Sequence, residues 1–189
     1  MAAEIVLVRH GETEWSANGR HTSATDLPLT SEGRRRARAL GPQLSERSFA
    51  LVLCSPLLRA RETCELAGFG EAAVTCEELR EWDYGRYEGM TRDEILREDP
   101  SWDLWRAGCP GGETPAQVGA RADVVLARLR DAGGDSLAFA HGHVLRVLTA
   151  CWVGMGPPGG ARFLLAAGAI GVLGHEHETK ALSQWNMCP

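Results

Sequence analysis

Residues 5–11 read IVLVRHG, and this stretch decides the predicted fold class. Its first four residues are β-branched or aliphatic without interruption, which is typical of a strand buried on both faces of a largely parallel sheet. Arg9 and His10 follow at the carboxyl end of that strand. Sheets of this kind, covered by helices on both faces, bind ligands at the carboxyl ends of their strands. The stretch therefore predicts an α/β protein with polar groups at the ligand-binding edge.

The rest of the chain alternates between apolar runs and amphipathic segments, as expected for strands joined by crossover helices. Buried strands are predicted at residues 51–54, 74–76 and 136–140, and two further strands at 167–177 and 182–185. Helices are predicted from Thr30 or Ser31 to Leu44, from Ser55-Pro56 to Ala67, from Thr114 to Leu129, and after residue 141 to Val153. These elements predict a three-layer α/β/α sandwich with a mostly parallel central sheet and an antiparallel edge strand.

Residues 81–113 differ from the rest of the chain because they are rich in Trp, Tyr and charged residues. Short helices are predicted near 91–98 and 102–107. We interpret this part as an excursion over the sheet edge that borders the active site, rather than as a second core. Residues 1–189 are therefore predicted to form a single domain, which agrees with the usual size of domains.

The composition excludes several classes of protein. With 44% hydrophobic and 24% charged residues, the chain of 189 residues matches neither a disordered nor a fibrous protein. Its formal charge of −5 argues against nucleic acid and anionic membranes as partners. The N-terminus lacks the basic and apolar regions of a signal peptide, and the longest nearly apolar stretch, 163–174, is too short to span a bilayer. Six cysteines without a C-x-x-C pair predict free thiols and a cytoplasmic location.

Histidines and arginines also follow two other predicted strands. The strand at 136–140 leads into HGH at residues 141–143, and the strand at 51–54 is followed by Arg59 and Arg61. If these strands are parallel neighbours of the first strand, the side chains meet at one edge of the sheet. Guanidinium groups can bind phosphate oxygens in bidentate fashion, and imidazoles lie beside them. The pattern predicts a site for a phosphate dianion that requires no metal.

Five motifs, in order along nearly the whole chain, resemble those of the histidine phosphatase superfamily, to which the phosphoglycerate mutases also belong. They are RHG at residues 9–11, LPLTxxG at 27–33, SPLLRAxxT at 55–63, LxExxYGxxEG at 79–89 and HG at 141–142. The resemblance implies the phosphoglycerate mutase-like form of the α/β/α fold. It also points to the phosphatase branch of the superfamily.

The resemblance implies a role for each matched residue. His10 would be the nucleophile that forms a phosphohistidine, and Arg9, Arg59 and His141 would hold the phosphoryl oxygens. Glu81 would donate a proton to the leaving alkoxide and later accept one from water. No cofactor and no metal is implied.

Further residues are implied as substrate contacts. Thr22 and Ser23 lie where relatives place a loop against the substrate, and Gly142 adjoins His141. Ser16 stands where an asparagine is common in the family. A serine hydroxyl can still bond phosphate, so the departure affects the strength of that contact rather than the reaction.

The leading hypothesis is a metal-independent phosphomonoester hydrolase that acts on a small phosphorylated metabolite, either a sugar phosphate or a short-acid phosphate. The chain lacks the longer middle insertion and the extended C-terminal tail of the mutases it resembles, which favours phosphoryl transfer to water. Two alternatives stay open: a phosphoglycerate mutase-type phosphotransferase, and a phosphate-binding module without turnover. The sequence does not identify the physiological substrate, and it leaves the oligomeric state open, a homodimer included.

Other residues of the excursion and its surroundings have simpler explanations. Trp82 and Trp105 are candidate walls of the substrate pocket, although most tryptophans pack in cores. Glu113 precedes a helix-capping threonine and is a candidate substrate contact. His143 is more consistent with the start of a helix than with phosphate binding, which stays the second choice because His143 adjoins Gly142.

Four further arginines and histidines are not matched positions of the motifs. Arg61 and Arg146 are expected to be solvated or paired with carboxylates on helix faces. His175 and His177 would need a third ligand to hold a metal, and their spacing lacks the usual zinc patterns. We assign none of these four residues to the site.

Overall fold

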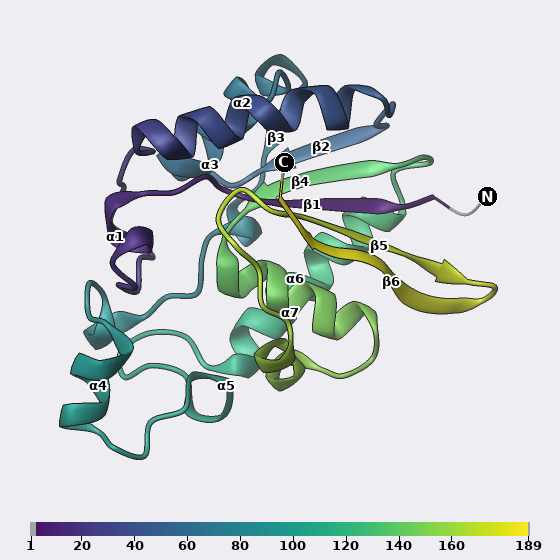
Figure 1. Cartoon of the computed structure of the whole chain (residues 1–189). Coiled ribbons are helices and arrows are strands. Elements are labelled where there is room, and N and C mark those ends of the chain that lie inside the picture. The colour runs from purple at the N-terminus through teal and green to yellow at the C-terminus, as the bar shows by residue number, and fades with distance from the viewer. Residues whose placement is uncertain (1–2, 189) are drawn as a thin grey trace.

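A six-stranded sheet organises the computed structural model, which describes residues 3–188 (Figure 1). The strand order is β3-β2-β4-β1-β5-β6. The strands β1 to β4 run parallel to one another, β5 is antiparallel to β1, and β6 is antiparallel to β5. Their bounds are Ile5–Arg9 for β1, Leu51–Cys54 for β2, Ala73–Thr75 for β3, Ser136–Ala140 for β4, Ile170–Glu176 for β5 and Thr179–Met187 for β6. The predicted strand positions and sheet type are confirmed.

Helices cover both faces of this sheet. The helices α2 (Ser31–Ser45) and α3 (Leu58–Leu66) lie on one face, and α6 (Pro115–Arg130) and α7 (Gly142–Trp152) lie on the other (Figure 1). Successive side chains of β1 point to opposite faces and fill two separate hydrophobic clusters, one under each pair of helices. The predicted three-layer α/β/α sandwich is therefore confirmed.

Side-chain caps fix where two of these helices begin. The hydroxyl of Thr30 accepts a hydrogen bond from the backbone N–H of Gly33 at the start of α2. Thr114 forms a capping box with Gln117 at the start of α6, where Pro115 takes the tolerated first-turn position. The helix starts predicted from these residue types are confirmed.

The start of α3 corrects a prediction. The helix begins at Leu58 rather than at the Ser55-Pro56 pair. The backbone N–H of Ser55 still donates to the carbonyl of Phe139, so Ser55 continues the sheet pairing instead of entering the helix. Ser55 is thereby held at the carboxyl end of β2, an inner strand of the sheet.

The remaining helices are short. The helices α4 (Arg92–Glu98) and α5 (Leu104–Ala107) lie close to their predicted positions. The pattern does not predict α1 (Glu14–Ala17), because four residues are too few to show a helical period. Single 3₁₀ turns occupy Gly70–Ala72, Glu77–Leu79 and Gly85–Tyr87, and a longer 3₁₀ helix occupies Pro157–Arg162.

The excursion at residues 81–113 belongs to the same core as α6 and α7. Its side chains Trp82, Tyr84, Ile95 and Trp102 are buried in the hydrophobic cluster that those helices fill. Figure 1 places α4 on the side of the molecule where β1 ends and α1 follows. The excursion therefore lies on the side of the molecule where the parallel strands end.

The cysteines are free thiols, as predicted, and Cys54, Cys64, Cys76 and Cys109 are buried. Within residues 3–188, none of the helices combines the length and the apolar character needed to cross a membrane.

The histidine pair near the end of β5 differs from the expected placement on one strand face. His175 lies in β5 with its ring 5.1 Å from that of Trp152. His177 lies beyond the strand, in the turn before β6, with φ of 52° and an exposed side chain. The turn therefore separates the two rings.

The loop after β1 depends on a close approach between two glycines. A Cβ atom at Gly11 would lie 2.6 Å from the carbonyl oxygen of Gly33, and one at Gly33 would lie 2.2 Å from the carbonyl oxygen of Glu12. Both distances are far below van der Waals contact. The first turn of α2 is therefore fixed directly against the backbone that follows His10.

We expect Gly33→Ala to lower the free energy of unfolding by about 1–3 kcal/mol, because the new methyl group must push the backbone of Glu12 aside. Urea unfolding measures this loss. Arg38→Ala changes an exposed position of the same helix and should alter stability by less than about 0.5 kcal/mol. Equal stability of Gly33→Ala and the parent protein would contradict the close packing of this loop.

Candidate active site

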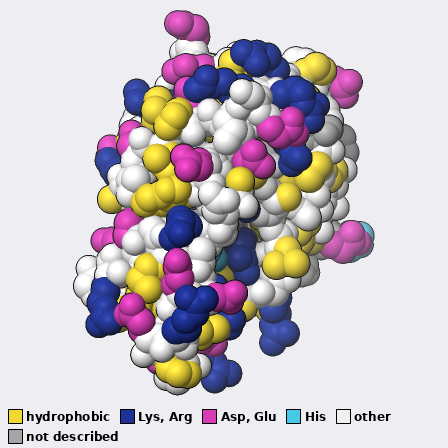
Figure 2. Space-filling model, turned by 60° about the vertical axis from the view of Figure 1, so that its left-hand side comes forward, with side chains coloured by type: hydrophobic (Ala, Val, Ile, Leu, Met, Phe, Trp, Pro, Cys, Tyr) yellow, Lys and Arg dark blue, Asp and Glu magenta, His cyan; other side chains and the backbone are white. Residues whose placement is uncertain are grey.

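A cavity of about 170 Å³ opens beside the carboxyl ends of β1 and β4. Figure 2 shows this face of the molecule hollowed, with Lys and Arg side chains in and around the hollow. Six of the predicted site residues line the cavity, and they are Arg9, His10, Ser16, Thr22, Glu81 and Gly142. Seven residues that were not predicted also line it, and they are Gly19, Arg20, His21, Tyr84, His143, Arg146 and Leu165.

The imidazole of His10 is buried at this cavity with a defined tautomer. Its Nδ1 lies 2.7 Å from the carbonyl oxygen of Gly11, which can only accept, so Nδ1 carries the proton. Burial, followed by the charges of Arg59 and Arg9, lowers the pKa of His10 well below its ordinary value. The ring is therefore neutral at neutral pH, with the lone pair on Nε2 free. This is the form that a nucleophilic imidazole requires.

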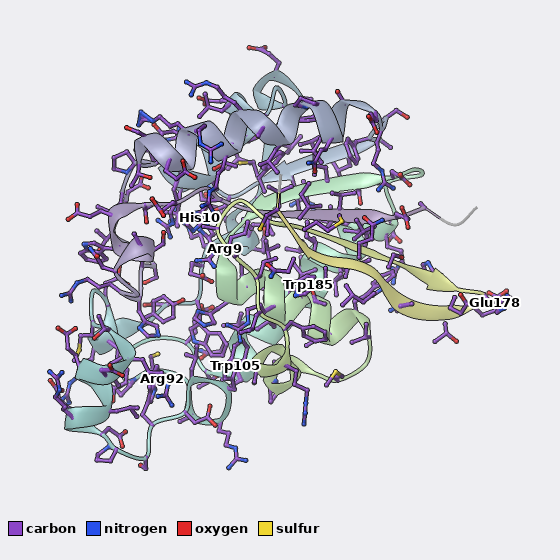
Figure 3. All side chains as sticks on the ribbon, in the orientation of Figure 1. Arg9, His10, Arg92, Trp105, Glu178 and Trp185 are labelled. Atoms are coloured by element: carbon purple, nitrogen blue, oxygen red, sulfur yellow. The ribbon has the colours of Figure 1, made fainter. Side chains whose placement is uncertain are left out.

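Arg9 lies beside His10 at the end of β1 (Figure 3). Its Nη1 donates to the backbone carbonyl of Leu165, and its buried Nε has no hydrogen-bond partner within residues 3–188. The guanidinium lies against Gly142, where a Cβ atom would be only 3.2 Å from Cζ of Arg9. A buried donor without an acceptor is unfavourable on its own, so this arrangement is suited to an anion in the cavity.

Arg59 and His141 contact each other and are not among the residues that line the cavity. Arg59 is fully buried and donates from Nε to Nδ1 of His141 at 3.1 Å. Since the guanidinium can only donate, the ring proton of His141 is on Nε2, which lies 2.7 Å from Oγ of Ser55. Burial, then the charge of Arg59, lowers the pKa of His141 well below its usual range, and its ring centre lies 5.1 Å from that of His10. The predicted meeting of these groups at one edge of the sheet is observed.

The remaining donors of Arg59 reach a loop rather than the cavity. They bond the backbone carbonyls of Thr22, Ser23 and Thr25 at 3.1–3.2 Å. The loop itself is held by Glu88, which accepts bonds from the backbone N–H groups of Ser23 and Thr25 and from the hydroxyl of Ser23. Ser23 is thus occupied by Glu88 and lies outside the cavity lining.

The carboxylate of Glu81 lies at the N-terminus of α7. Its Oε1 accepts backbone N–H bonds from Trp82 and Val144 at 2.9 Å, and its Oε2 accepts one from His143 at 3.0 Å. An acidic group is favoured at this end of a helix, where backbone donors are unpaired. Oε2 keeps the larger unused capacity to bind a proton or a ligand, because it accepts one bond rather than two.

Glu113, a candidate substrate contact from the sequence, does not line the cavity. Its carboxylate pairs with Arg121 of α6, with two contacts of 2.8 Å. Burial by itself raises the pKa of Glu113, but the bonds from Arg121 and from the backbone of Asp83 outweigh it and leave the pKa below its ordinary value. Glu113 is therefore a structural anion rather than a pocket group.

The outer part of the cavity is formed by two histidines stacked in parallel, with ring centres 6.0 Å apart. His21 donates from Nδ1 to the carbonyl of Met90, and burial lowers its pKa, so its Nε2 is an acceptor. His143 contacts the hydroxyl of Tyr84 at 2.5 Å, and burial lowers its pKa well below the usual range. Both rings are neutral, and they offer hydrogen bonds to an uncharged part of a ligand.

Arg146 corrects the expectation of a solvated or carboxylate-paired side chain. It lines the cavity, and its guanidinium lies 4.5 Å above the ring of Trp105. It donates to the backbone carbonyls of Gly160 and Ala161, and within residues 3–188 no carboxylate lies within 4.0 Å of it. Trp105 therefore supports a cavity residue from behind rather than forming the wall itself.

The two other predicted hydroxyl contacts lie at the cavity but bond the backbone. Ser16 accepts from the N–H of Thr13 at 2.9 Å as part of the capping box of α1. Thr22 donates to the carbonyl of Arg20 at 3.1 Å. Trp82, the other candidate wall, is fully buried and does not line the cavity.

Sequence signals existed for some of the unpredicted lining residues. Tyr84 is part of the matched motif at residues 79–89, and Arg146 follows His143 by three positions on a helix, which places both on one face. Leu165 carries no such signal, because its contribution is a backbone carbonyl to Arg9.

Comparison with known proteins agrees with this geometry. The family model described as the histidine phosphatase superfamily (branch 1) matches residues 5–187. The chain belongs to the histidine phosphatase superfamily. It is 42% identical to an acid phosphatase of Mycobacterium tuberculosis, over 95% of this chain and 90% of that protein. It is 36% identical to sedoheptulose 1,7-bisphosphatase of Saccharomyces cerevisiae, over 82% of this chain and 69% of that protein.

Comparison with a solved structure shows that the chain also has the fold of a known protein. The product of an open reading frame from Mycobacterium tuberculosis superimposes with a TM-score of 0.94 and 38% sequence identity, covering 100% of this chain and 99% of that one. The chain is therefore an enzyme, a phosphatase of the histidine phosphatase superfamily.

We expect His10 and His141 of this phosphatase to be neutral at pH 6.5 with opposite tautomers, the proton lying on Nδ1 in His10 and on Nε2 in His141. Their lowered pKa values mean that each ring takes up a proton only when the pH falls well below 6.5. Long-range ¹H–¹⁵N NMR spectra of labelled protein distinguish the two tautomers and the imidazolium. An imidazolium signal from either residue at pH 6.5 would contradict the geometry.

Proposed function

We propose that this phosphatase hydrolyses small phosphomonoesters through a phosphohistidine at His10. The observation that carries the proposal is the neutral ring of His10, with Nδ1 bonded to Gly11 and Nε2 free at a cavity where Arg9 presents an unpartnered donor. Phosphoryl transfer depends mainly on such positioning and on cations around the transferring group. The names of the relatives support the same reaction class.

The reaction takes place in two displacements. In the first, Nε2 of His10 bonds to phosphorus, the ester P–O bond breaks, and the leaving alkoxide takes a proton from Oε2 of Glu81. In the second, water attacks the phosphohistidine, Glu81 accepts a proton from that water, and the P–N bond breaks to release phosphate. Over the two displacements His10 is freed again, and Glu81 regains the proton that it gave to the leaving group. General acid and base assistance of this kind contributes ~10² to 10⁴ in rate.

Arginines supply the positive charge in this proposal, so the reaction is metal-independent. Arg9 and Arg59 are the phosphoryl-binding cations, with His141 between Arg59 and Ser55. Arg59 now bonds the carbonyls of residues 22–25, and a phosphoryl oxygen would take the place of one of these acceptors. Ser16, Thr22 and Gly142 line the cavity and remain proposed contacts, whereas the Ser23 hydroxyl would have to leave Glu88 to reach a substrate.

The substrate in this proposal is a phosphorylated sugar or short acid with a second anionic group. The cavity of about 170 Å³ is small for a ligand pocket, which favours a small metabolite. Arg146 has no carboxylate partner within residues 3–188, so its charge is available to a phosphate or carboxylate at the far end of the substrate. The neutral rings of His21 and His143 lie at the same cavity and suit hydroxyl groups.

We expect His10→Ala to abolish hydrolysis across a panel of phosphomonoesters while the protein stays folded, because no other nucleophile is proposed. The parent enzyme should be fully active with a chelator present. It should also yield an acid-labile, base-stable phosphoenzyme on rapid quenching, and His10→Ala should not. Residual turnover in pure His10→Ala protein, or loss of parent activity with chelator, would contradict the proposal.

The same assay distinguishes the alternatives. Conversion of 3-phosphoglycerate to its isomer with a trace of bisphosphoglycerate, without release of inorganic phosphate, would indicate a mutase. Phosphate binding by the folded parent protein without turnover of any panel member would indicate a binding module. Release of inorganic phosphate from small phosphomonoesters is the expected result.

We expect Arg146→Gln to lower kcat/KM about 10- to 100-fold for a substrate with a second anionic group and much less for p-nitrophenyl phosphate. A sugar bisphosphate and a phosphoglycerate distinguish a second phosphate from a carboxylate. Arg162→Gln makes the same charge change at an exposed residue nearby and should have little effect on either substrate. Equal losses on both substrate types in Arg146→Gln would remove this role.

A further inference from the structure

Two systems hold Glu81 in place, and only one of them involves its carboxylate. The N-terminus of α7 binds the carboxylate, as described above. The backbone on either side of Glu81 is bound separately by Arg121 and Glu113, two residues that do not line the cavity. Arg121 comes from α6, and Glu113 immediately precedes the cap of that helix.

The guanidinium of Arg121 binds the backbone before Glu81. Its Nη1 donates to the carbonyls of Glu78 and Arg80, both at 2.7 Å, and its Nη2 donates to the carbonyl of Glu81 at 3.1 Å. Its Nε and Nη2 also donate to the two carboxylate oxygens of Glu113. Three of these five hydrogen bonds fix the carbonyls of residues 78, 80 and 81 against α6, and the other two hold Glu113.

Glu113 binds the backbone after Glu81. Its Oε2 accepts the N–H of Asp83 at 2.9 Å, and its own N–H donates to the carbonyl of Asp83 at 2.9 Å. Its carbonyl accepts the indole N–H of Trp82 at 2.9 Å. The ion pair therefore fixes the residues that precede Glu81 and the residues that follow it.

Burial sets this ion pair apart from the others in the described part of the chain. The side chains of Arg121 and Glu113 are 17% and 21% exposed, lower as a pair than any other ion pair within residues 3–188. Arg35 and Glu32, by comparison, are 70% and 37% exposed. Exposed pairs contribute little, whereas a shielded bidentate pair with further backbone bonds holds a fixed geometry.

We propose that Arg121 and Glu113 form a clamp that positions Glu81 for its two proton transfers. This inference rests on the proposed role of Glu81 as proton donor and acceptor. The clamp residues touch neither substrate nor reacting atoms, so they are positioning residues. Their effect follows from geometry, because a carboxyl group must be within hydrogen-bond reach of the leaving oxygen and then of the attacking water, and a misplacement of 1 Å can cost ~10² in rate.

The test compares two leaving groups in the variant Arg121→Met. The alkoxide of a sugar phosphate needs a proton to depart, whereas the phenolate of p-nitrophenyl phosphate departs with little help. We expect kcat on the sugar phosphate to fall about 10- to 100-fold, kcat on p-nitrophenyl phosphate to fall less than about threefold, and KM to change little on either. Arg121→Lys keeps the charge without the fork and should give a smaller loss.

A double variant separates positioning from a general structural role. If the clamp acts only through Glu81, then Arg121→Met combined with Glu81→Gln should be no slower on the sugar phosphate than Glu81→Gln alone. Multiplication of the two losses in the double variant would overturn the clamp proposal.

A matched control and a second variant guard against unfolding. Arg128→Met lies two turns further along the same helix, contacts Cys76 and Glu78 but not residues 80–83, and should leave both activities unchanged. Thermal unfolding checks that each variant is folded. If Arg121→Met does not fold, Glu113→Gln removes the charge of the partner with nearly the same shape and should show the same dependence on leaving group.

The results for Glu81→Gln and Arg121→Met distinguish failure of the clamp proposal from failure of the proposed role of Glu81. Equal losses on both substrates in Glu81→Gln would remove Glu81 as proton donor, and the clamp proposal with it. A selective loss in Glu81→Gln, together with equal losses or none in the folded Arg121→Met variant, would leave Glu81 in its role and overturn the clamp alone.

Discussion

The site depends on guanidinium groups that are held by backbone carbonyls instead of carboxylates. Arg9 donates to Leu165, Arg59 donates to the loop at residues 22–25, and Arg146 donates to Gly160 and Ala161. Carbonyl dipoles fix the position of a cation without cancelling its charge, so that charge remains available to a bound anion. Burial lowers the pKa of each of these arginines, and the charge of Glu81 offsets this only in part. Surface arginines such as Arg35 are paired with glutamates and are not available in this way.

This constraint extends to loops that make no contact with phosphate. The loop at residues 22–25 can present its carbonyls to Arg59 because Glu88 binds its N–H groups on the other side. Bonds from Ser23 and Thr25 hold the pKa of Glu88 below its ordinary value, despite the burial that raises it. Glu88 therefore stays ionised and orders a loop whose carbonyls hold a cation. The last glutamate of the matched motif at residues 79–89 has a physical function without lying at the cavity.

The sequence predicts best those features that depend on local pattern. Apolar runs located β1, β2 and β4, and their parallel arrangement brought His10, Arg59 and His141 together as expected. Features that depend on tertiary packing could not be predicted from the sequence in the same way. An arginine on a helix is usually solvated, and only the packing of Trp105 and the turn at 157–162 against α7 makes Arg146 a cavity residue. Likewise, nothing local distinguishes Glu113 as a partner of Arg121 rather than of substrate, because the bond spans α6 and the excursion. The contribution of Leu165 is a main-chain oxygen, which has no residue type to reveal it.

The inner and outer parts of the cavity are stabilised by different kinds of interaction. The inner part, at Arg9, His10 and Glu81, is fixed by the end of β1 and by the N-terminus of α7, so its geometry is set by backbone hydrogen bonds. The outer part, at His21, Tyr84, His143 and Arg146, is fixed by side-chain stacking and by the excursion. Arg121 and Glu113 line neither part, but their bonds to the backbone of residues 78–83 connect α6 to the segment that carries the proposed proton donor.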